Sequence, residues 1–417
     1  MTHFEQILTK VKTASQTITD LPEETIQAVL LDFATALVAA EAEILAANQK
    51  DLKKMDANNL ARPRVELTSD KIKNMARDIR AVAALPSPLH KTLDERTLYN
   101  GLTLSRVSVP FGVIGIMYEA RPNVTADIFS LCLKTGNACV LKGGSDAAKS
   151  STAIVAVIKK ILGKHHLDSN IIHLITGGRA EAQKMMKAVK FIDVIIPRGS
   201  AELINYVRQN AHVPIIETGA GIVHTFMDES ADVEMAARII HNAKTNRPAV
   251  CNSLDTLIIH EKKLPDLGKI ILPLVDSEVQ IFADKKSFAV LKKKYPKKFI
   301  RQATPKHFGT EFLSLKMSVK TVASLDEALK HIATYSSKHS EAILSTDKKN
   351  IERFLAEVDA AVVYANTATV FTDGAEFGLG AEVGISTQKL HARGPMGLSA
   401  LTSYKWIVRG DGQIRSK

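Results

Sequence analysis

The chain has 417 residues, of which 45% are hydrophobic and 24% are charged, a composition typical of a globular protein with two or three domains. No apolar run reaches the roughly 20 residues that a membrane-spanning helix needs, and the N-terminus lacks the apolar core of a signal peptide. The 55 Lys and Arg against 44 Asp and Glu give a net charge of +11, which favours anionic partners such as phosphorylated metabolites, nucleotides or nucleic acid.

The three cysteines, Cys132, Cys139 and Cys251, show no spacing typical of a metal site or of a disulfide framework. Unpaired thiols are typical of a reducing compartment, so we expect a cytoplasmic protein. The 13 histidines include no H-E-x-x-H pattern, and we therefore expect no metal site.

The first part of the chain is predicted to be helical. Apolar residues recur at helical spacing between residues 3 and 50, and Pro22 followed by two glutamates is typical of a helix start. A further helix is expected over Ser69–Ala84, because Pro86 and Pro88 then end the pattern. This segment carries no pattern that indicates chemistry.

Residues 95–107 are predicted to form a β-hairpin. Asn100-Gly101 lies between two alternating apolar segments, which is a strong hairpin signal. Two strands alone are marginally stable, and another strand without an obvious partner, Ser403–Val408, ends the chain. We expect residues 95–107 and 398–412 to form an arm through which the protein assembles into a homo-oligomer.

From Phe111 onward, apolar runs alternate with helical segments. The expected strands are Gly112–Met117, Ala138–Lys142, Ile171–Thr176, Ile192–Pro197 and Val213–Glu217. The expected helices are Thr125–Lys134, Asp146–Gly163, Ala180–Ala188 and Ser200–Asn210. This alternation predicts a doubly wound α/β domain with a parallel sheet, in which ligands bind beyond the carboxyl ends of the strands. We assign residues 1–94 and 108–218 to this domain.

The expected carboxyl ends of these strands are rich in glycine. Three of them carry Lys142-Gly143-Gly144-Ser145, Thr176-Gly177-Gly178-Arg179 and Pro197-Arg198-Gly199-Ser200. Each precedes a helix start, where free backbone N–H groups and the helix dipole favour phosphate. Three such loops at one edge indicate a dinucleotide site, although the full G-x-G-x-x-G pattern is absent.

A second α/β domain is predicted over residues 219–375. Strands and helices alternate again over Thr256–His260, Lys316–Val322, Asp326–Thr334, Ala342–Ser345, Lys348–Val358 and Ala361–Asn366. Seven lysines between residues 285 and 298 form the densest basic stretch of the chain, and we expect it to be a solvated and weakly structured surface segment. Three interleaved aromatic residues are few for a base-stacking surface.

Cys251 follows a rigid bend, Asn246-Arg247-Pro248-Ala249-Val250, and precedes an apolar strand. A thiol held in this way can be presented to a cleft, and its thiolate is a strong nucleophile toward an acyl carbon. A lone cysteine is also commonly a small buried hydrophobic residue. The residues around Cys251 leave both interpretations open.

The order of these motifs resembles the aldehyde dehydrogenase superfamily, because Cys251 follows Glu217 at the spacing of that superfamily's Glu and Cys pair. Three further motifs are similar to its gamma-glutamyl phosphate reductase family, and they are Tyr118-Glu119-Ala120-Arg121-Pro122-Asn123, Glu376–Glu382 and His391-Ala392-Arg393-Gly394-Pro395-Met396-Gly397. The resemblance covers nearly the whole chain. It implies reduction of L-glutamyl 5-phosphate to L-glutamate 5-semialdehyde and phosphate, the second step of proline biosynthesis.

The resemblance also implies roles for individual residues. Cys251 would form the thioester, Asn123 would stabilise the oxyanion, and Glu217 would stand where hydrolytic relatives carry the glutamate that activates water. Because hydrolysis would waste the substrate, our hypothesis is that Glu217 instead helps to activate Cys251. The substrate contacts implied by position and charge are Arg121, Asn366, Thr367, His391 and Arg393.

The expected cofactor is NADPH, with NADP⁺ as its oxidised form, held by Lys142, Gly143, Ser145, Gly177, Gly199 and Ser200. Many NAD-preferring relatives place a carboxylate where this chain has Ser145. The hydroxyl removes repulsion toward a 2′-phosphate, and Lys142 can add attraction. A transient contact with glutamate 5-kinase, which makes the labile substrate, is a further expectation.

Two other functions remain open at this stage. Glu217 is compatible with a hydrolytic NAD(P)-dependent aldehyde dehydrogenase that oxidises an aldehyde to a free acid. The basic surplus is compatible with a nucleic-acid-binding protein without catalysis. Our leading prediction includes neither a nucleic acid nor a membrane among the partners.

Overall fold

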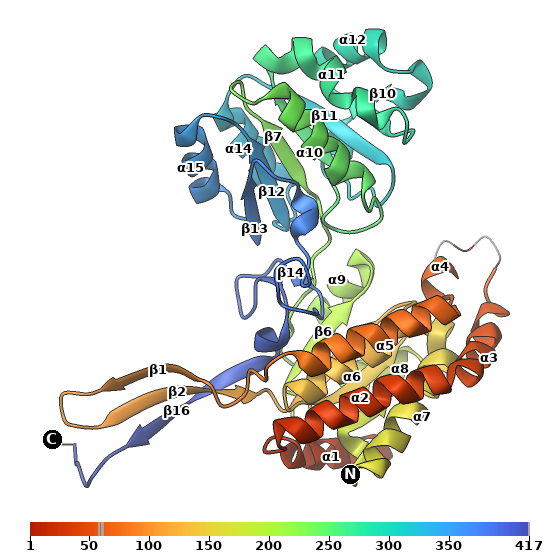
Figure 1. The fold of residues 1–417 in the computed structure, drawn as a ribbon, viewed down its shortest axis with the longest axis vertical. Helices are drawn as coiled ribbons and strands as arrows, with labels where there is room; N and C mark the ends of the chain where they lie inside the picture. Colours follow the sequence, from red (N-terminus) through yellow and green to blue (C-terminus); the bar gives the residue numbers. More distant parts are fainter. Residues whose placement is uncertain (57–58, 60–61, 416–417) are drawn as a thin grey trace. The chain divides into compact units, whose positions relative to one another are not determined.

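The computed structural model describes residues 1–56, 59 and 62–415. The chain divides into two compact units. The first unit consists of Met1–Thr218, Gly378–Gly384 and Met396–Lys417, and the second of Gly219–Phe377 and Ile385–Pro395. Both are built from a parallel sheet and helices (Figure 1), which confirms the predicted α/β fold class.

The sheet of the first unit has four parallel strands in the order β5-β4-β3-β6. Their bounds are β3 Val113–Tyr118, β4 Ala138–Gly143, β5 Ile172–Leu174 and β6 Val194–Arg198. Every residue of β3 is buried, as expected of a central parallel strand whose two faces are both covered. The expected strand Val213–Glu217 is wrong, because only one bridge, between Ile195 and Ile215, forms there.

Helices cover this sheet. They are α1 His3–Thr17, α2 Glu23–Ala39, α3 Glu41–Leu52, α4 Arg62–Val65, α5 Ser69–Ala84, α6 Asn123–Lys134, α7 Ala148–Lys164, α8 Arg179–Met186 and α9 Ala201–Asn210, with short 3₁₀ turns at Ser145–Ala147, Ser169–Ile171 and Leu398–Leu401. The helices α6 and α7, which connect neighbouring strands, pack against α2, α3 and α5. Phe33 and Phe129 meet edge to face between α2 and α6, with ring centroids 5.5 Å apart.

The predicted hairpin and the last strand form a three-stranded antiparallel sheet, β1-β2-β16. Its strands are β1 Thr92–Thr97, β2 Thr103–Pro110 and β16 Thr402–Arg409, and they run together as one extension of the first unit (Figure 1). The turn closes at Asn100-Gly101, where the backbone N–H of Gly101 donates to Leu98 O at 3.0 Å. Tyr404 and Trp406 are exposed on β16, and the Arg106 guanidinium lies over both rings.

The second unit has a seven-stranded sheet in the order β10-β9-β11-β8-β7-β12-β13, all parallel. The strands are β7 His224–Met227, β8 Thr256–His260, β9 Gln280–Ala283, β10 Ile300–Gln302, β11 Lys316–Val322, β12 Ser340–Leu344 and β13 Val362–Ala365. A separate two-stranded ladder joins β14 Ile385–Ser386 to β15 Gly394–Pro395.

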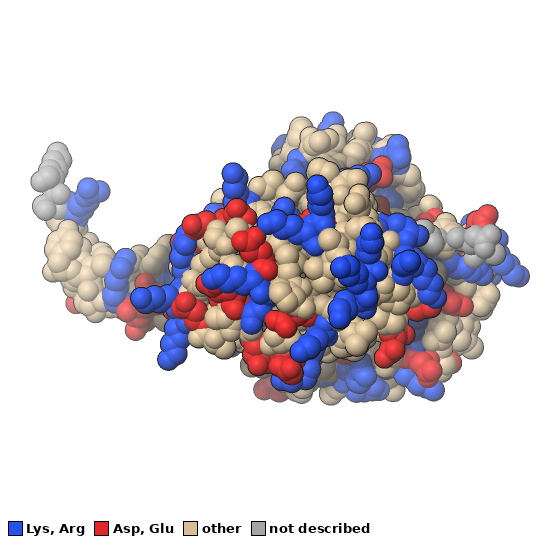
Figure 2. Space-filling model, turned by 90° about the horizontal axis from the view of Figure 1, so that it is seen from above, with Lys and Arg blue, Asp and Glu red and all other residues tan. Residues whose placement is uncertain are grey.

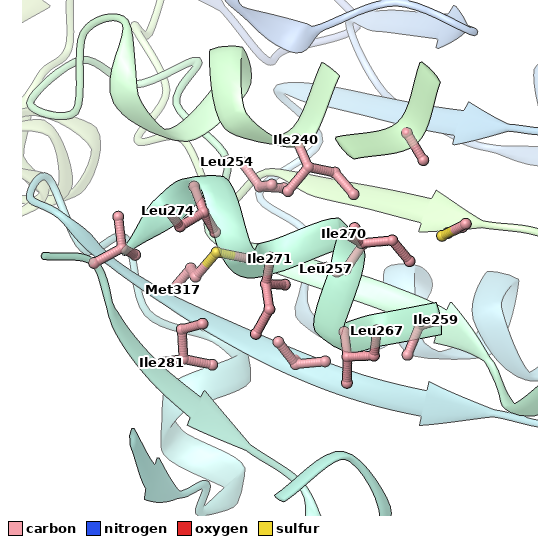
Figure 3. Close-up of a cluster of buried hydrophobic side chains, with 14 of the residues drawn as sticks. Ile240, Leu254, Leu257, Ile259, Leu267, Ile270, Ile271, Leu274, Ile281 and Met317 are labelled. Atoms are coloured by element: carbon pink, nitrogen blue, oxygen red, sulfur yellow. The ribbon is translucent and has the colours of Figure 1, made fainter. Parts of the chain in front are cut away.

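The helices of the second unit are α10 Val233–Thr245, α11 Leu267–Ile271, α12 Lys285–Lys294, α13 Pro305–Phe308, α14 Leu325–Tyr335 and α15 Lys348–Glu357, with 3₁₀ turns at Glu261–Asp266, Leu272–Leu274, Lys297–Phe299 and Thr369–Phe371. Figure 3 shows part of the core between α10, α11 and the sheet, where Ile240, Leu257 and Ile270 are fully buried. This core fixes α10 and β8, the two elements that flank the Cys251 loop.

The lysine-rich stretch is not weakly structured as predicted. It forms helix α12, which begins after Asp284, whose carboxylate accepts from the backbone N–H of Ser287 at 2.9 Å. Lys286 pairs with Glu261 at 2.7 Å. Figure 2 shows basic and acidic side chains interspersed over the visible face, so the net charge is dispersed there. Within residues 1–56, 59 and 62–415, no helix is long and apolar enough to cross a bilayer.

Candidate functional site

Cys251 lies in a turn between α10 and β8, and its side chain is half-buried. The turn is tight, since the backbone N–H of Val250 donates to Arg247 O at 3.4 Å and that of Ser253 donates to Val250 O at 3.2 Å. The other two cysteines, Cys132 and Cys139, are buried. Cys251 is therefore the one cysteine that is partly accessible, as a nucleophile must be.

Hydrogen bonds hold the loop that carries Cys251 on both sides. Lys244 donates from Nζ to Leu254 O at 2.7 Å, and the backbone N–H of Leu254 donates to Ala243 O at 3.0 Å. The Asn252 amide donates to the carbonyls of Val370 and Thr372 at 3.1 and 3.0 Å. The end of α10, the start of β8 and the 370–372 segment thus hold the residue next to Cys251.

A buried pair of opposite charges lies beside this loop. The Lys244 side chain is fully buried, and the Asp255 carboxylate accepts from the backbone N–H groups of Phe312 at 2.9 Å and Val223 at 3.2 Å. Burial raises the pKa of Asp255 and lowers the pKa of Lys244. The charge of each residue acts on the pKa of the other in the opposite direction to burial. Such a pair fixes local geometry when its remaining donors and acceptors are used.

Gly221 approaches the Cys251 backbone very closely. A Cβ atom at position 221 would lie 1.5 Å from the Cys251 carbonyl oxygen, so only glycine fits there. The backbone N–H of Gly221 donates to Glu311 Oε1 at 2.7 Å. The position of Cys251 therefore depends on the segment that precedes β7 as well as on its own loop.

In the first unit, the predicted cofactor residues meet at one edge of the sheet. Lys142 and Gly143 end β4, Gly177 follows β5, and Gly199 and Ser200 follow β6. Because these strands are parallel neighbours, their carboxyl ends lie at the same edge. Ser145 follows β4 in a short 3₁₀ turn and is exposed.

Lys142 is half-buried, and its Nζ donates to the Gly143 carbonyl at 2.9 Å. Burial lowers the pKa of this amine, and the nearby Glu181 carboxylate opposes the shift. Glu181 is in the first turn of α8, and the prediction of NADPH from Ser145 and Lys142 did not include this carboxylate.

A carboxylate occupies the N-terminus of α9. The backbone N–H of Ser200 donates to Glu119 Oε2 at 2.8 Å, and the Ser200 hydroxyl donates to Glu119 Oε1 at 3.3 Å. A Cβ atom at Gly199 would lie 2.5 Å from Glu119 Oε2. The loop therefore presents an anion-binding N–H group at a helix start, in a cradle that a side chain at position 199 would fill. This donor set fits a pyrophosphate.

Asn123 begins helix α6 but does not cap it, since the N-cap residue is Pro122 and no side chain makes a cap hydrogen bond there. Its amide instead donates from Nδ2 to Asp127 Oδ2 at 3.0 Å, one helical turn further on. Burial raises the pKa of Asp127 to about 6, against the opposing charge of Arg198.

Glu217 forms an ion pair within the first unit. Its carboxylate is buried and accepts from Arg208 Nε at 2.7 Å, and a second guanidinium N–H donates to its other oxygen. The pair raises the pKa of Arg208. Glu217 is thus held by a bidentate contact from α9, which was not predictable from the residue pattern.

The predicted substrate residues come from several segments of the chain. Arg393 pairs with Asp359 at 2.7 Å, and Lys338 and Lys389 reach the same carboxylate at 2.9 and 3.2 Å, which holds the pKa of Asp359 far below its usual range. Arg121 and His391 are exposed.

Asn366 and Thr367 follow the carboxyl end of β13, whereas Cys251 precedes the amino end of β8 in the same parallel sheet. The Asn366 side chain is engaged with the backbone of Ser345, accepting from its N–H and donating to its C=O, both at 2.9 Å. A substrate contact at these two residues stays a prediction. In the described part of the chain, no group of three or more His, Cys, Asp or Glu side chains is arranged to hold a metal ion.

Comparison with protein families gives a match of residues 3–276 to the aldehyde dehydrogenase family. Among curated proteins, the chain is 56% identical over 408 residues to the gamma-glutamyl phosphate reductase of Pelodictyon phaeoclathratiforme, covering 98% of each chain. It is 52% identical over 414 residues to the enzyme of that name from Bacteroides thetaiotaomicron, covering 99% of each.

Solved structures give the same result. The crystal structure of gamma-glutamyl phosphate reductase from Thermotoga maritima matches with a TM-score of 0.94 at 37% identity, covering 100% of both chains. An acetylating aldehyde dehydrogenase from Geobacillus thermoglucosidasius matches with a TM-score of 0.70 at 16% identity, covering 99% of this chain and 98% of that chain. This second likeness concerns the fold alone.

Proposed function

The chain belongs to the aldehyde dehydrogenase family and, within it, to the gamma-glutamyl phosphate reductases, and from this premise we propose how its residues carry out the reaction. The reaction reduces L-glutamyl 5-phosphate to L-glutamate 5-semialdehyde and phosphate, the second step of proline biosynthesis from glutamate. The observation that carries the proposal is the half-buried thiol of Cys251 on a loop fixed by hydrogen bonds from both sides.

Cys251 is the nucleophile in this proposal. Its thiolate attacks the acyl carbon, the C–O bond to phosphate breaks, and a thioester forms as phosphate leaves. NADPH, when bound, supplies the hydride that brings the thioester carbon to the aldehyde level. Cys251 then leaves as a thiolate and takes up a proton, which frees the semialdehyde.

Asn123 and the backbone N–H of Cys251 are proposed as donors to the oxyanion that forms during acyl transfer. Removing one such donor typically lowers the rate by about 10²- to 10³-fold. The Asn123 amide uses one N–H on Asp127, so a second N–H remains for an oxyanion.

The cofactor residues of the proposal are Lys142, Gly143, Ser145, Gly177, Gly199 and Ser200. The Ser200 N–H now holds the Glu119 carboxylate, and a pyrophosphate fits the same N–H group and helix dipole. Lys142, at the end of β4, is proposed to bind the adenosine ribose.

We propose NADPH as the preferred reductant because position 145 carries a hydroxyl where a carboxylate would repel a 2′-phosphate. The Glu181 charge near Lys142 opposes this preference. Steady-state kinetics with both cofactors checks it, and we expect a higher kcat/KM with NADPH. A kcat/KM with NADH that is equal or higher contradicts the assignment.

Glu217 is proposed to assist in activating Cys251 rather than in hydrolysis. Its bidentate contact with Arg208 occupies both carboxylate oxygens, so taking a proton from the thiol or from water means giving up a hydrogen bond to the guanidinium. Arg121, His391 and Arg393 are proposed for the anionic groups of the substrate, and Asn366 and Thr367 for its amino-acid end. We also propose a cytoplasmic location, a homo-oligomer built through the β1-β2-β16 arm, and a transient contact with glutamate 5-kinase.

A coupled assay tests the nucleophile. Glutamate kinase, glutamate and ATP generate the acyl phosphate in place, and NADPH absorbance is followed with wild type and with Cys251→Ala. We expect turnover with wild type and none above background with the variant, because no other thiol replaces Cys251. Cys132→Ala, at a buried cysteine, serves as the control and should retain turnover.

A hydrolytic aldehyde dehydrogenase is the alternative, favoured by the presence of Glu217. Oxidation of glutamate semialdehyde with NADP⁺ separates the two functions. The reductase requires inorganic phosphate for turnover in this direction, because phosphate must attack the thioester. Sustained turnover without phosphate would support the hydrolytic enzyme.

A further inference from the structure

Asp127 contacts the side chain of Asn123, a proposed catalytic residue that lies one helical turn before it on the same helix. Asn123 is the first residue of α6, and its Nδ2 donates to Asp127 Oδ2 at 3.0 Å. An asparagine at a helix start commonly caps the helix through its side-chain oxygen. Here Pro122 holds the N-cap position, so the orientation of the Asn123 amide is set by Asp127.

The geometry of the amide explains why this orientation matters. A carboxamide nitrogen carries two hydrogens that point in fixed directions about 120° apart in the amide plane, so fixing one of them fixes the other. With Asp127 as an acceptor, Nδ2 faces Asp127 and one N–H stays available. If the amide turned over, the oxygen would take that position and the free N–H would point elsewhere.

Two charges and one hydrogen bond act on Asp127. Arg198, at the end of β6, favours the ionised carboxylate, and Asp78 on α5 disfavours it, while the contact from Asn123 on α6 favours it. Burial is the largest effect, and the pKa of Asp127 rises to about 6. The carboxylate is therefore mostly ionised near pH 7 and becomes protonated about one pH unit lower.

We infer that Asp127 is a positioning residue of this reaction, whose carboxylate fixes the Asn123 amide so that its second N–H is presented to the oxyanion. The inference rests on the proposed role of Asn123. When protonated, Asp127 presents an O–H donor and favours the amide oxygen as its partner. The reaction then loses an oriented donor without losing any group that binds the substrate.

The expected signature is a pH effect on kcat with little effect on KM, because oxyanion stabilisation acts in the transition state. In wild type, kcat should fall on the acid side with a midpoint near pH 6. If Asp127 had only a structural role on α6, substituting it would lower the stability of the protein, and the variants would keep the pH dependence of kcat.

The test uses the full-length enzyme, glutamate semialdehyde, NADP⁺ and phosphate between pH 5 and 8. Asp127→Asn keeps the shape of the side chain and one acceptor oxygen but removes the titrating group. We expect it to lose the acid limb. Because its amide offers a donor beside one acceptor oxygen, as the protonated acid does, it should also lower kcat at pH 8 about tenfold. Asp127→Ala should lower kcat about tenfold at unchanged KM, since a mispositioned group costs one to two orders of magnitude.

Asp78→Asn is an independent check, because Asp78 is exposed on α5 and belongs to no proposed site. Removing its charge should move the acid limb of kcat to lower pH without changing kcat at pH 8. The rate of Cys251 alkylation is measured over the same range, so that thiol ionisation is recorded separately. An acid limb that persists unchanged in Asp127→Asn overturns the inference.

Asn123→Ala distinguishes failure of the inference from failure of the proposed function. A variant that retains wild-type kcat would remove Asn123 from the reaction and the inference with it. If Asn123→Ala lowers kcat about 100-fold while Asp127→Asn behaves like wild type at every pH, the role of Asn123 stands and that of Asp127 fails.

Discussion

At the scale of single residues, the contact between Arg208 and Glu217 bears on the choice between phosphate transfer and hydrolysis. Arg208 is half-exposed on α9, and Glu217 is buried, with both carboxylate oxygens engaged by the guanidinium. To take a proton from water, a carboxylate held in this way must give up a charge-assisted hydrogen bond.

We therefore expect Arg208→Met to raise phosphate-independent formation of glutamate from the semialdehyde, by up to about tenfold, since general-base catalysis typically contributes 10²- to 10⁴-fold when fully developed. Product analysis in the absence of phosphate measures the rate of glutamate formation. Glu217→Gln should lower this hydrolysis and slow Cys251 alkylation near pH 7. These roles are contradicted if Arg208→Met does not raise the rate of phosphate-independent glutamate formation. They are also contradicted if Cys251 is alkylated in the Glu217→Gln variant at the wild-type rate across pH.

The sequence indicated some of these residues and could not indicate others. The bend before Cys251 was predictable because Pro248 restricts the local backbone. The Arg208 contact was not, because the two partners lie nine positions apart and meet only where the chain returns from α9. Glu119 stood inside a recognised motif, but its contact with Ser200, 81 positions away, depends on strands β3 and β6 being neighbours.

At the scale of elements, the close approach of Gly221 to the Cys251 loop makes a sharp prediction. Gly221→Ala should lower kcat by about 100-fold, because its Cβ must displace a backbone oxygen that lies 1.5 Å away. Overpacking of this kind also lowers the free energy of unfolding by about 1–3 kcal/mol. Steady-state kinetics and denaturant unfolding measure the two effects.

Gly163→Ala is the matched control, since a Cβ at this position near the end of α7 meets nothing within 4 Å. Alanine is the better helix former, so the control should gain about 0.5–1 kcal/mol of stability and keep its activity. An active Gly221→Ala variant would show that the loop tolerates a shift of Cys251.

The elements that the sequence predicted well are those with unbroken apolar runs. β3 and β4 are examples, because buried parallel strands need apolar residues on both faces. Val213–Glu217 failed as a strand because Pro214 has no N–H for a ladder, and a single bridge remains. Helix α10 was missed although Asp232 caps it and Ala236, Ile240 and Ala243 recur at helical spacing.

At the scale of the whole molecule, buried histidines make stability depend on pH. His331 and His339 are buried, and burial lowers their pKa values to about 3 and about 4. Both are depressed below the ordinary value of about 6.5. The unfolded chain therefore binds more protons than the folded chain below that pH, and stability is lost as pH falls from about 6.5 toward 4.

Each such histidine contributes a slope of up to about 1.4 kcal/mol per pH unit in this range. We expect His339→Asn to flatten the decline of unfolding free energy between pH 6.5 and 4.5, as measured by urea titration. His3→Asn, at an exposed histidine, should leave the slope unchanged. Parallel curves for His339→Asn and wild type would mean that this histidine does not contribute to the acid sensitivity.

The path of the chain between its two units decides what happens when the protein is expressed as a fragment or cleaved by a protease. The backbone passes from one unit to the other at 218–219, 377–378, 384–385 and 395–396, so a gene fragment ending at residue 218 would encode an incomplete first unit. A protease that nicks the chain at 218–219 would leave β2 and β16 on different pieces. Their ladder, which runs from Thr402 opposite Pro110 to Arg409 opposite Thr103, would still tie the two pieces together without a covalent link.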